Sequence, residues 1–299
     1  MPDTPYVRVI SPYEVNPPGD IGPFPFDLYQ RACLAQGDSW FSIGALPPTD
    51  TTNVLAELQV RKSTVVVNCA RPGKVLTHMA DSTTEMMFLR QLTGNSARKW
   101  DAILISGVGN DVIDAARLPP THAPEHRLLK TVAERSGDPL VGENYICEPG
   151  WTTLRDHIEL VFNQLVGRRD SGVNRGQPML FHNYARLQPR PAPAGPGFGP
   201  WLQPAFDAFS IPANAWLAVS DALMNRTDQL LKELVREHMQ VDSAAALYVV
   251  ETRTAALLLA QPASAGRSGD YQNEIHPTVG GYAKVASVWR ASLEALPTW

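Results

Sequence analysis

The sequence has few cysteines, no long apolar run and no excess of positive charge. Its 299 residues include three cysteines, an odd number without zinc-ligand spacing, which argues against a disulfide-stapled or zinc-stabilised scaffold. No stretch approaches the roughly 18 consecutive apolar residues of a transmembrane helix. Lys and Arg number 26 against 30 Asp and Glu, a net charge of -4, so no basic field is present to bind nucleic acid.

The N-terminal segment also lacks a basic region followed by an apolar stretch, the pattern of a cleavable signal peptide. We therefore expect a cytoplasmic protein, with signal-independent export as the alternative. Hydrophobic residues make up 44% of the chain and charged residues 19%, which is enough apolar material for a large core and predicts a globular protein.

Short apolar runs alternate with longer segments of helical periodicity along most of the chain. This alternation predicts an α/β fold whose parallel sheet is covered by helices on both faces. The five expected strands are residues 31–36, 64–68, 102–106, 178–182 and 246–251. The expected helices are residues 51–58, 82–92, 152–166, 214–238 and 279–296, the second opened by a capping box of Ser82 and Glu85.

Proline divides the remaining chain. Residues 1–28 contain seven prolines and are predicted to form an extended arm, followed by a single domain over residues 29–299. Residues 111–150 and 188–204 interrupt the alternation and are predicted to be loop insertions. The second insertion is either a plain linker or a lid over a substrate site, because Phe198 and Trp201 are aromatics that a spacer does not need.

Three expected strands are each followed by a turn that can carry chemistry. Ser39 follows Gly37 and Asp38, and a serine at the carboxyl end of a parallel strand stands where ligands bind, although Gly-Asp-Ser is also ordinary turn chemistry. Asn110 follows the pair of glycines after residue 106 and offers an amide donor at the same edge; the phosphate-loop pattern is incomplete here. Gly73 follows the strand 64–68 and can direct its N–H toward the same edge.

One of the seven histidines lies in a context that fixes its position. Pro277 keeps the preceding residue out of helical angles, so His276 is expected on a loop before the last helix. An imidazole can activate a serine hydroxyl by taking its proton, and amide donors can stabilise the oxyanion that follows. Ser39, His276 and the donors around Gly73 and Asn110 together meet these needs.

Taken in chain order, Ser39, Gly73, Asn110 and His276 resemble the four signature blocks of the SGNH (GDSL-type) hydrolase family. The resemblance extends from about residue 33 to residue 290. It implies a flavodoxin-like three-layer α/β/α fold around a five-stranded parallel sheet, and ester hydrolysis without metal or cofactor. It also implies that Ser39 is the nucleophile and His276 the base, with an oxyanion hole from the Ser39 and Gly73 amides and the Asn110 side chain.

The chain departs from the family pattern at the residue that orients the histidine. The family has an aspartate three residues before this histidine, whereas this chain has Asn273, whose amide oxygen can accept the imidazole N–H but brings no charge. Asp270 is the other candidate, and a dyad of Ser39 and His276 alone is the third possibility. Without a carboxylate behind the ring, we expect the pKa of His276 to lie near the unperturbed value of about 6.5.

These observations predict a serine hydrolase that cleaves small-molecule or lipid carboxylic esters. The alternatives are a binding protein on the same fold that has lost its chemistry, and an acyltransferase to an alcohol. We expect the substrate pocket to be formed by residues 41–50, 111–150 and 188–204. The sequence does not indicate the acyl length, the leaving group or the oligomeric state.

Overall fold

A computed structural model of the protein describes residues 5–19, 22–43, 51–94 and 97–299. Its centre is a six-stranded sheet in which all paired strands are parallel, in the order β1-β3-β2-β4-β5-β6. The strands are β1 (Arg8–Ile10), β2 (Arg31–Gly37), β3 (Thr64–Asn68), β4 (Ala102–Ser106), β5 (Met179–His182) and β6 (Leu247–Val250).

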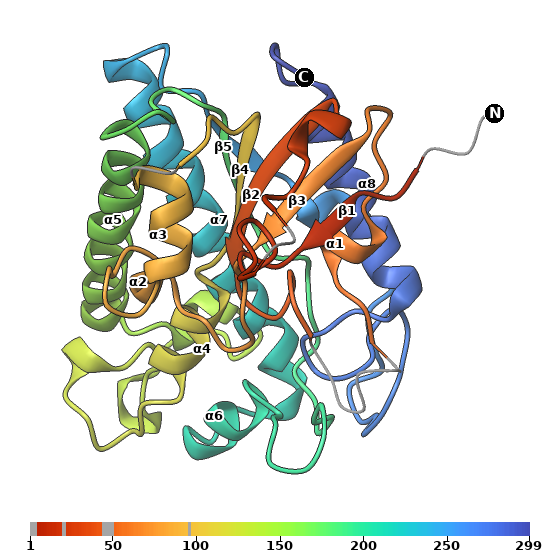
Figure 1. The fold of residues 1–299 in the computed structure, drawn as a ribbon. Helices are drawn as coiled ribbons and strands as arrows, with labels where there is room; N and C mark the ends of the chain where they lie inside the picture. The colour runs from red at the N-terminus through yellow and green to blue at the C-terminus, as the bar shows by residue number, and fades with distance from the viewer. Residues whose placement is uncertain (1–4, 20–21, 44–50, 95–96) are drawn as a thin grey trace.

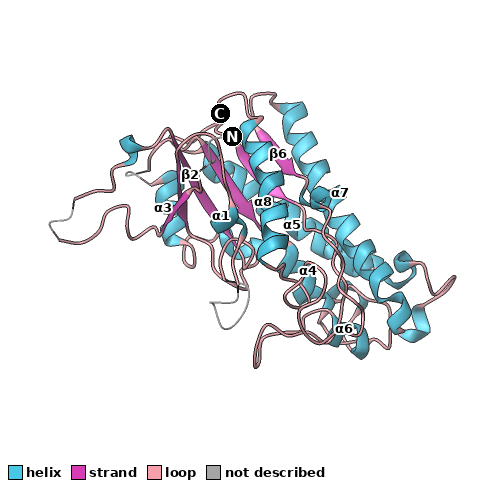
Figure 2. Ribbon diagram, turned by 90° about the vertical axis from the view of Figure 1, so that its right-hand side faces the viewer, coloured by secondary structure: helices cyan, strands magenta, loops and turns pink. Residues whose placement is uncertain are grey.

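Helices cover both faces of this sheet (Figures 1 and 2). On one face α1 packs against α8, and on the other α5 packs against α2, α3, α4 and α7. The helices are α1 (Val54–Glu57), α2 (Leu76–Met79), α3 (Met86–Thr93), α4 (Gly109–Ala116), α5 (Glu148–Asp170), α6 (Gln203–Ala208), α7 (Trp216–Val241) and α8 (Val279–Glu294). The α/β/α fold class expected from the sequence is therefore confirmed.

The number of strands differs from the expectation by one. Residues 8–10 lie inside the predicted extended arm, yet they pair with β3 as an edge strand, and the sheet begins there instead of near residue 29. Three residues are too few to give a strand pattern among so many prolines. Without β1 the order is β3-β2-β4-β5-β6, the flavodoxin-like order, in which the chain reverses direction across the sheet between β2 and β4. Ligands bind at this point in open α/β sheets.

The five predicted strands match β2 to β6 closely because their residues carry strong strand signals. The centre of β3 is a run of three valines that is buried on both faces, as a parallel sheet covered by helices requires. The predicted capping box of Ser82 and Glu85 is wrong. The Glu85 carboxylate is buried, pairs with Lys74 and accepts a hydrogen bond from Gln36, so α3 begins only at Met86.

Two further findings bear on the exclusions drawn from the sequence. All three cysteines are free and buried. None of the helices in the described residues is long and apolar enough to span a membrane.

The close pairing of β2 with β4 requires a glycine at the end of β2. Gly37 lies opposite Ser106 in the register, and a Cβ on Gly37 would lie 2.6 Å from the Ser106 Cβ and 2.8 Å from its carbonyl oxygen. Because backbone and a buried side chain cannot yield easily, this position admits no side chain without displacing the strand that leads into Ser39.

We predict that Gly37→Ala lowers the free energy of unfolding by about 1–3 kcal/mol through this overlap. Gly167 is the matched control, since it is exposed within α5 and a Cβ there has no atom within 4 Å. Gly167→Ala should stabilise by about 0.5–1 kcal/mol, because alanine loses less backbone entropy in a helix. Urea unfolding of both variants measures the two effects, and equal stability of Gly37→Ala and the parent would contradict the packing described.

Candidate active site

The carboxyl ends of the strands bring together the predicted site residues. Ser39 lies two residues beyond the end of β2, and Asn110 lies in the first turn of α4, directly after β4. Gly73 follows β3, and His276 lies three residues before the start of α8. Ser39, Gly73, Asn110 and His276 all line one groove, although 237 residues separate the first from the last.

A hydrogen-bonded chain runs through Ser39, His276 and Asn273. The Ser39 hydroxyl lies 2.7 Å from Nε2 of His276, and Nδ1 of His276 lies 2.9 Å from Oδ1 of Asn273. The exposed fraction is 7% for Ser39, 2% for His276 and 1% for Asn273, so the chain is shielded from bulk water. In this geometry an imidazole can take the proton of the serine hydroxyl while the third residue orients the ring.

Backbone contacts of the Asn273 side chain fix which nitrogen of the His276 imidazole carries the proton. Oδ1 of Asn273 also accepts the backbone N–H groups of Ile275 at 3.2 Å and His276 at 2.9 Å. An amide nitrogen cannot accept hydrogen bonds, so the atom facing the ring is the oxygen and Nδ1 of His276 is the protonated nitrogen. Nε2 is then free to accept the Ser39 proton.

Asp270, the other candidate for the orienting group, is held elsewhere. Its Oδ2 accepts the backbone N–H of Leu258 at 2.7 Å and pairs with the ammonium of Lys284 on α8 at 2.6 Å. Partial burial would raise its pKa, but these two partners lower the pKa below the usual range. Of the two residues singled out from the sequence, the structure places Asn273 and not Asp270 behind the ring.

The pKa of His276 differs from the value near 6.5 expected from the sequence. Complete burial disfavours the imidazolium and lowers the pKa to about 3. The expectation from sequence considered only the missing carboxylate and not desolvation. His276 is therefore neutral, and ready to accept a proton, at any pH above about 4.

Three residues that line the groove carry N–H groups available for hydrogen bonding: Ser39, Gly73 and Asn110. Among the described residues, the backbone N–H groups of Ser39 and Gly73 have no protein acceptor, and Asn110 uses only one of its two amide hydrogens, in a 2.9 Å bond to the carbonyl of Lys74. Gly73 adopts a φ of +74°, in the left-handed region that favours glycine. N–H groups without a protein acceptor are the kind of donor that can stabilise a developing negative charge.

Hydrogen bonds fix the Gly73 loop against α4. Besides the bond from Asn110 to the Lys74 carbonyl, the buried Asp111 carboxylate accepts the backbone N–H of Leu76 at 2.8 Å. The side chain of Lys74 pairs with Glu85, which anchors the other side of the loop. The donors at residues 73 and 110 are thus held relative to each other before any ligand arrives.

The backbone that leads into Asn110 is strained. Val108 has a φ of +81°, which a β-branched residue rarely adopts and which costs roughly 1–3 kcal/mol. The next residue, Gly109, packs so closely that a Cβ would lie 2.7 Å from the ring of Tyr184. Strain of this kind is typical of functional sites.

The groove itself has a volume of about 360 Å³ and is mostly apolar. Its walls include Ala194, Phe198 and Trp201 from the predicted insertion 188–204, and the rings of Trp201 and His276 pack edge to face with their centres 5.1 Å apart. This insertion therefore contacts the site and is more than a linker. Of the other predicted pocket walls, Ile43 lines the groove, and residues 44–50 lie outside the described residues. Residues 111–150 were also expected to line it, but none of them is among the groove's lining residues.

Glu274 and Arg190, which the sequence did not single out for a role, bind this insertion to the histidine loop. The buried Glu274 carboxylate accepts the backbone N–H groups of Arg190, Trp201, Leu202 and Gln203. The buried Arg190 guanidinium donates to the Asn273 carbonyl at 2.7 Å and to the Gly266 carbonyl. A glutamate two residues before His276 was the only signal in the sequence, and it did not reveal these partners.

A second buried network surrounds Asp38, the residue before Ser39. The Asp38 carboxylate accepts hydrogen bonds from Ser106 Oγ at 2.7 Å, the Tyr184 hydroxyl and the Trp40 N–H at 2.9 Å. Burial raises the pKa of Asp38 to about 6 in spite of these donors. His182 extends the network through a 2.8 Å bond to Ser106, so it is a buried structural histidine.

No protein-family model matches the sequence, and no curated protein matches it either. Solved structures of similar shape include an extracellular lipase of Streptomyces rimosus, at 13% identity over 87% of this chain and 99% of that chain, with a TM-score of 0.49. The acetylxylan esterase Axe2 of Geobacillus stearothermophilus is 15% identical over 90% and 96% of the two chains, with a TM-score of 0.44. A protein of Parabacteroides merdae described as GDSL-like lipase is 10% identical over 88% and 95%, with a TM-score of 0.42.

The orientation and burial of His276 give a prediction that needs no substrate. In the parent protein the imidazole should stay neutral down to about pH 4 when followed by NMR. Asn273→Asp places a negative charge behind the ring, favours the imidazolium and should raise the pKa by about one to three pH units. Asp270→Asn is the matched control and should leave the titration of His276 unchanged, because Asp270 binds Lys284. A larger change in the Asp270 variant than in the Asn273 variant would contradict the geometry.

Proposed function

We propose that this protein is a serine esterase of the SGNH type, which hydrolyses carboxylic esters through an acyl-enzyme on Ser39. The observation that carries the proposal is the buried chain from Ser39 through His276 to Asn273, next to three N–H donors on the same groove. The order of these residues in the sequence and the parallel sheet beneath them support the same conclusion.

In the first half of the reaction, Ser39 Oγ attacks the ester carbonyl carbon while Nε2 of His276 takes the hydroxyl proton. The carbonyl oxygen becomes an oxyanion and accepts hydrogen bonds from the Ser39 and Gly73 amides and from the free N–H of Asn110. When the carbon–oxygen bond to the leaving group breaks, His276 gives its proton to the departing alcohol. The products are the alcohol and an acyl ester of Ser39.

In the second half, a water molecule replaces the alcohol. His276 accepts a proton from the water as its oxygen attacks the acyl carbon, and the same donors stabilise the second oxyanion. Collapse of this intermediate returns the proton to Ser39 and releases the carboxylic acid. Every step uses side chains or backbone groups of this chain together with water.

Asn273 orients the imidazole without supplying a charge. Its oxygen holds the N–H tautomer that leaves Nε2 unprotonated, which is the orienting part of what a triad aspartate does. It provides no charge to stabilise the imidazolium, so the transition state depends more heavily on the preorganised oxyanion donors.

We predict that Ser39→Ala abolishes labelling by a fluorophosphonate probe and lowers turnover of p-nitrophenyl acetate by about 10⁶-fold, as loss of a nucleophile does elsewhere. Ser42→Ala is the matched control, since Ser42 lies nearby but donates only to the Asp38 carbonyl. Labelling of the Ser39 variant as strong as that of the parent would refute the assignment. Absence of both labelling and hydrolysis in the folded parent would favour the binding-protein alternative. If an alcohol added to the assay speeds the release of p-nitrophenol and is itself converted to an ester, the result would favour acyl transfer.

The oxyanion role of Asn110 can be tested separately from binding. Its free N–H gains most of its value once negative charge develops on the substrate, so Asn110→Ala should lower kcat by about 10²–10³-fold with KM nearly unchanged. Steady-state kinetics of the folded variant, verified by circular dichroism, give both constants. A rise in KM with normal kcat would make Asn110 a ground-state binding residue instead.

A further inference from the structure

A second, much smaller cavity adjoins the groove at Ser39. This cavity has a volume of about 20 Å³, and Ser39, Asn110 and Ile275 line both it and the groove. His276 and Gly73 line only the wide groove. The remaining walls of the small cavity are Asp38, Trp40, Gly109, Ile113, Tyr184, Leu187, Leu202 and Met224.

From this juxtaposition, and resting on the proposed ester hydrolysis, we infer that the site selects esters of a very short acyl group, acetate above all, on a larger apolar alcohol. The acyl group occupies the small cavity between Ser39 and Met224, and the alcohol occupies the groove beside Phe198 and Trp201.

The position of His276 assigns the two parts of the substrate to the two spaces. The leaving oxygen must receive its proton from Nε2 of His276, so the alcohol extends into the space that His276 lines. The oxyanion points at the donors of Ser39, Gly73 and Asn110. The one remaining substituent of the tetrahedral carbon is the acyl chain, and the space left for it is the cavity behind Ser39 and Asn110.

The size of the small cavity limits the acyl chain. A volume of about 10–15 Å³ admits a single water-sized sphere, so about 20 Å³ admits a methyl group and excludes a chain of several carbons. The groove, at about 360 Å³, is large enough for an aromatic or branched alcohol. The difference in volume therefore favours acetyl esters of bulky alcohols over long-chain acyl esters of small alcohols.

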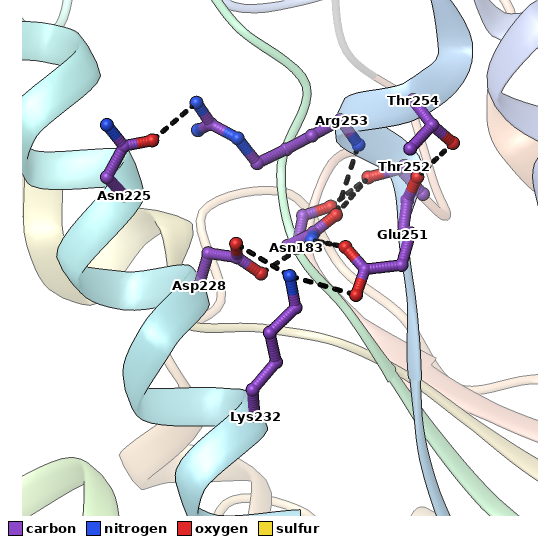
Figure 3. Close-up of polar contacts among 8 residues, drawn as sticks. All are labelled: Asn183, Asn225, Asp228, Lys232, Glu251, Thr252, Arg253 and Thr254. Carbon is purple, nitrogen blue, oxygen red and sulfur yellow. Dashed lines mark hydrogen bonds and ion pairs between the residues drawn. The ribbon is translucent and has the colours of Figure 1, made fainter.

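Polar contacts join the segments that precede or adjoin two wall residues of the cavity, Tyr184 and Met224 (Figure 3). Asn183, which precedes the wall residue Tyr184, donates to Asp228 of α7 and to Glu251 after β6. Lys232 of α7 bridges the same two carboxylates, at 2.9 Å from each.

The same set of polar contacts includes the neighbour of Met224, the cavity wall residue on α7. The guanidinium of Arg253 donates to Asn225, the residue next to Met224, at 2.7 Å. The hydroxyl of Tyr184 is itself fixed by its hydrogen bond to Asp38. A longer acyl chain would therefore have to displace segments that are joined by several polar contacts.

The test compares p-nitrophenyl acetate with p-nitrophenyl hexanoate, two esters with the same leaving group. We expect the parent to prefer acetate in kcat/KM by at least about tenfold, since a filled pocket discriminates by this much or more per misfitting group. Met224→Ala removes a buried wall of the small cavity and should raise the hexanoate-to-acetate ratio by about tenfold or more. Ile113→Ala, on another wall of the cavity, gives a second variant should the first not fold.

Phe198→Ala is the matched control because Phe198 lines only the groove. Its hexanoate-to-acetate ratio should equal that of the parent, whereas its preference among acetate esters of different alcohols should change.

Three outcomes overturn the inference. A parent that prefers hexanoate places the acyl chain in the groove, and an unchanged ratio in the folded Met224 and Ile113 variants shows that the cavity holds only water. In both cases fluorophosphonate labelling of Ser39 leaves the proposed function intact. A folded parent that neither hydrolyses any ester nor reacts at Ser39 refutes the proposed function together with this inference.

Discussion

The hydrogen bond between the Ser39 hydroxyl and Nε2 of His276 is the contact on which the account of this protein depends. It joins a turn after β2 to a loop before the last helix, so it exists only when the whole sheet has assembled between them. The histidine loop reaches this position because Asn273 binds its backbone and ring, while Arg190 and Glu274 fasten it to the insertion above. Burial then keeps the imidazole neutral and able to accept the Ser39 proton.

The sheet explains why groups from distant parts of the sequence meet at one edge. Parallel strands all end on the same side, and the reversal of chain direction between β2 and β4 leaves a crevice where the turns after them diverge. Gly37 allows these two strands to approach closely, and the strained Val108 brings Asn110 onto the crevice. Rigid elements thus hold the donors in place before a ligand binds, which is the condition for electrostatic stabilisation of a transition state.

Much of this arrangement could be predicted from the sequence, because strand periodicity and the turn residues that follow it are local signals. Valine runs marked β3, and a glycine or asparagine after a strand marked the edge of the sheet. What could not be predicted depends on contacts between distant residues. The choice between Asn273 and Asp270 required the position of Lys284, and the pKa of His276 required its burial. The partners of Glu85 overrode a local capping pattern in the same way, and the small cavity is formed by residues from six separate segments.

In the proposed reaction, Ser39 attacks a carbonyl carbon whose oxygen accepts hydrogen bonds from the amides of Ser39 and Gly73 and from the side chain of Asn110. A crystal structure of the protein after reaction with diethyl p-nitrophenyl phosphate tests it most directly, because the tetrahedral phosphorus adduct imitates the transition state. The account predicts one adduct, on Ser39 Oγ, with its phosphoryl oxygen at about 2.7–3.1 Å from all three donors. An adduct on another residue, or a phosphoryl oxygen directed away from Gly73 and Asn110, would contradict it.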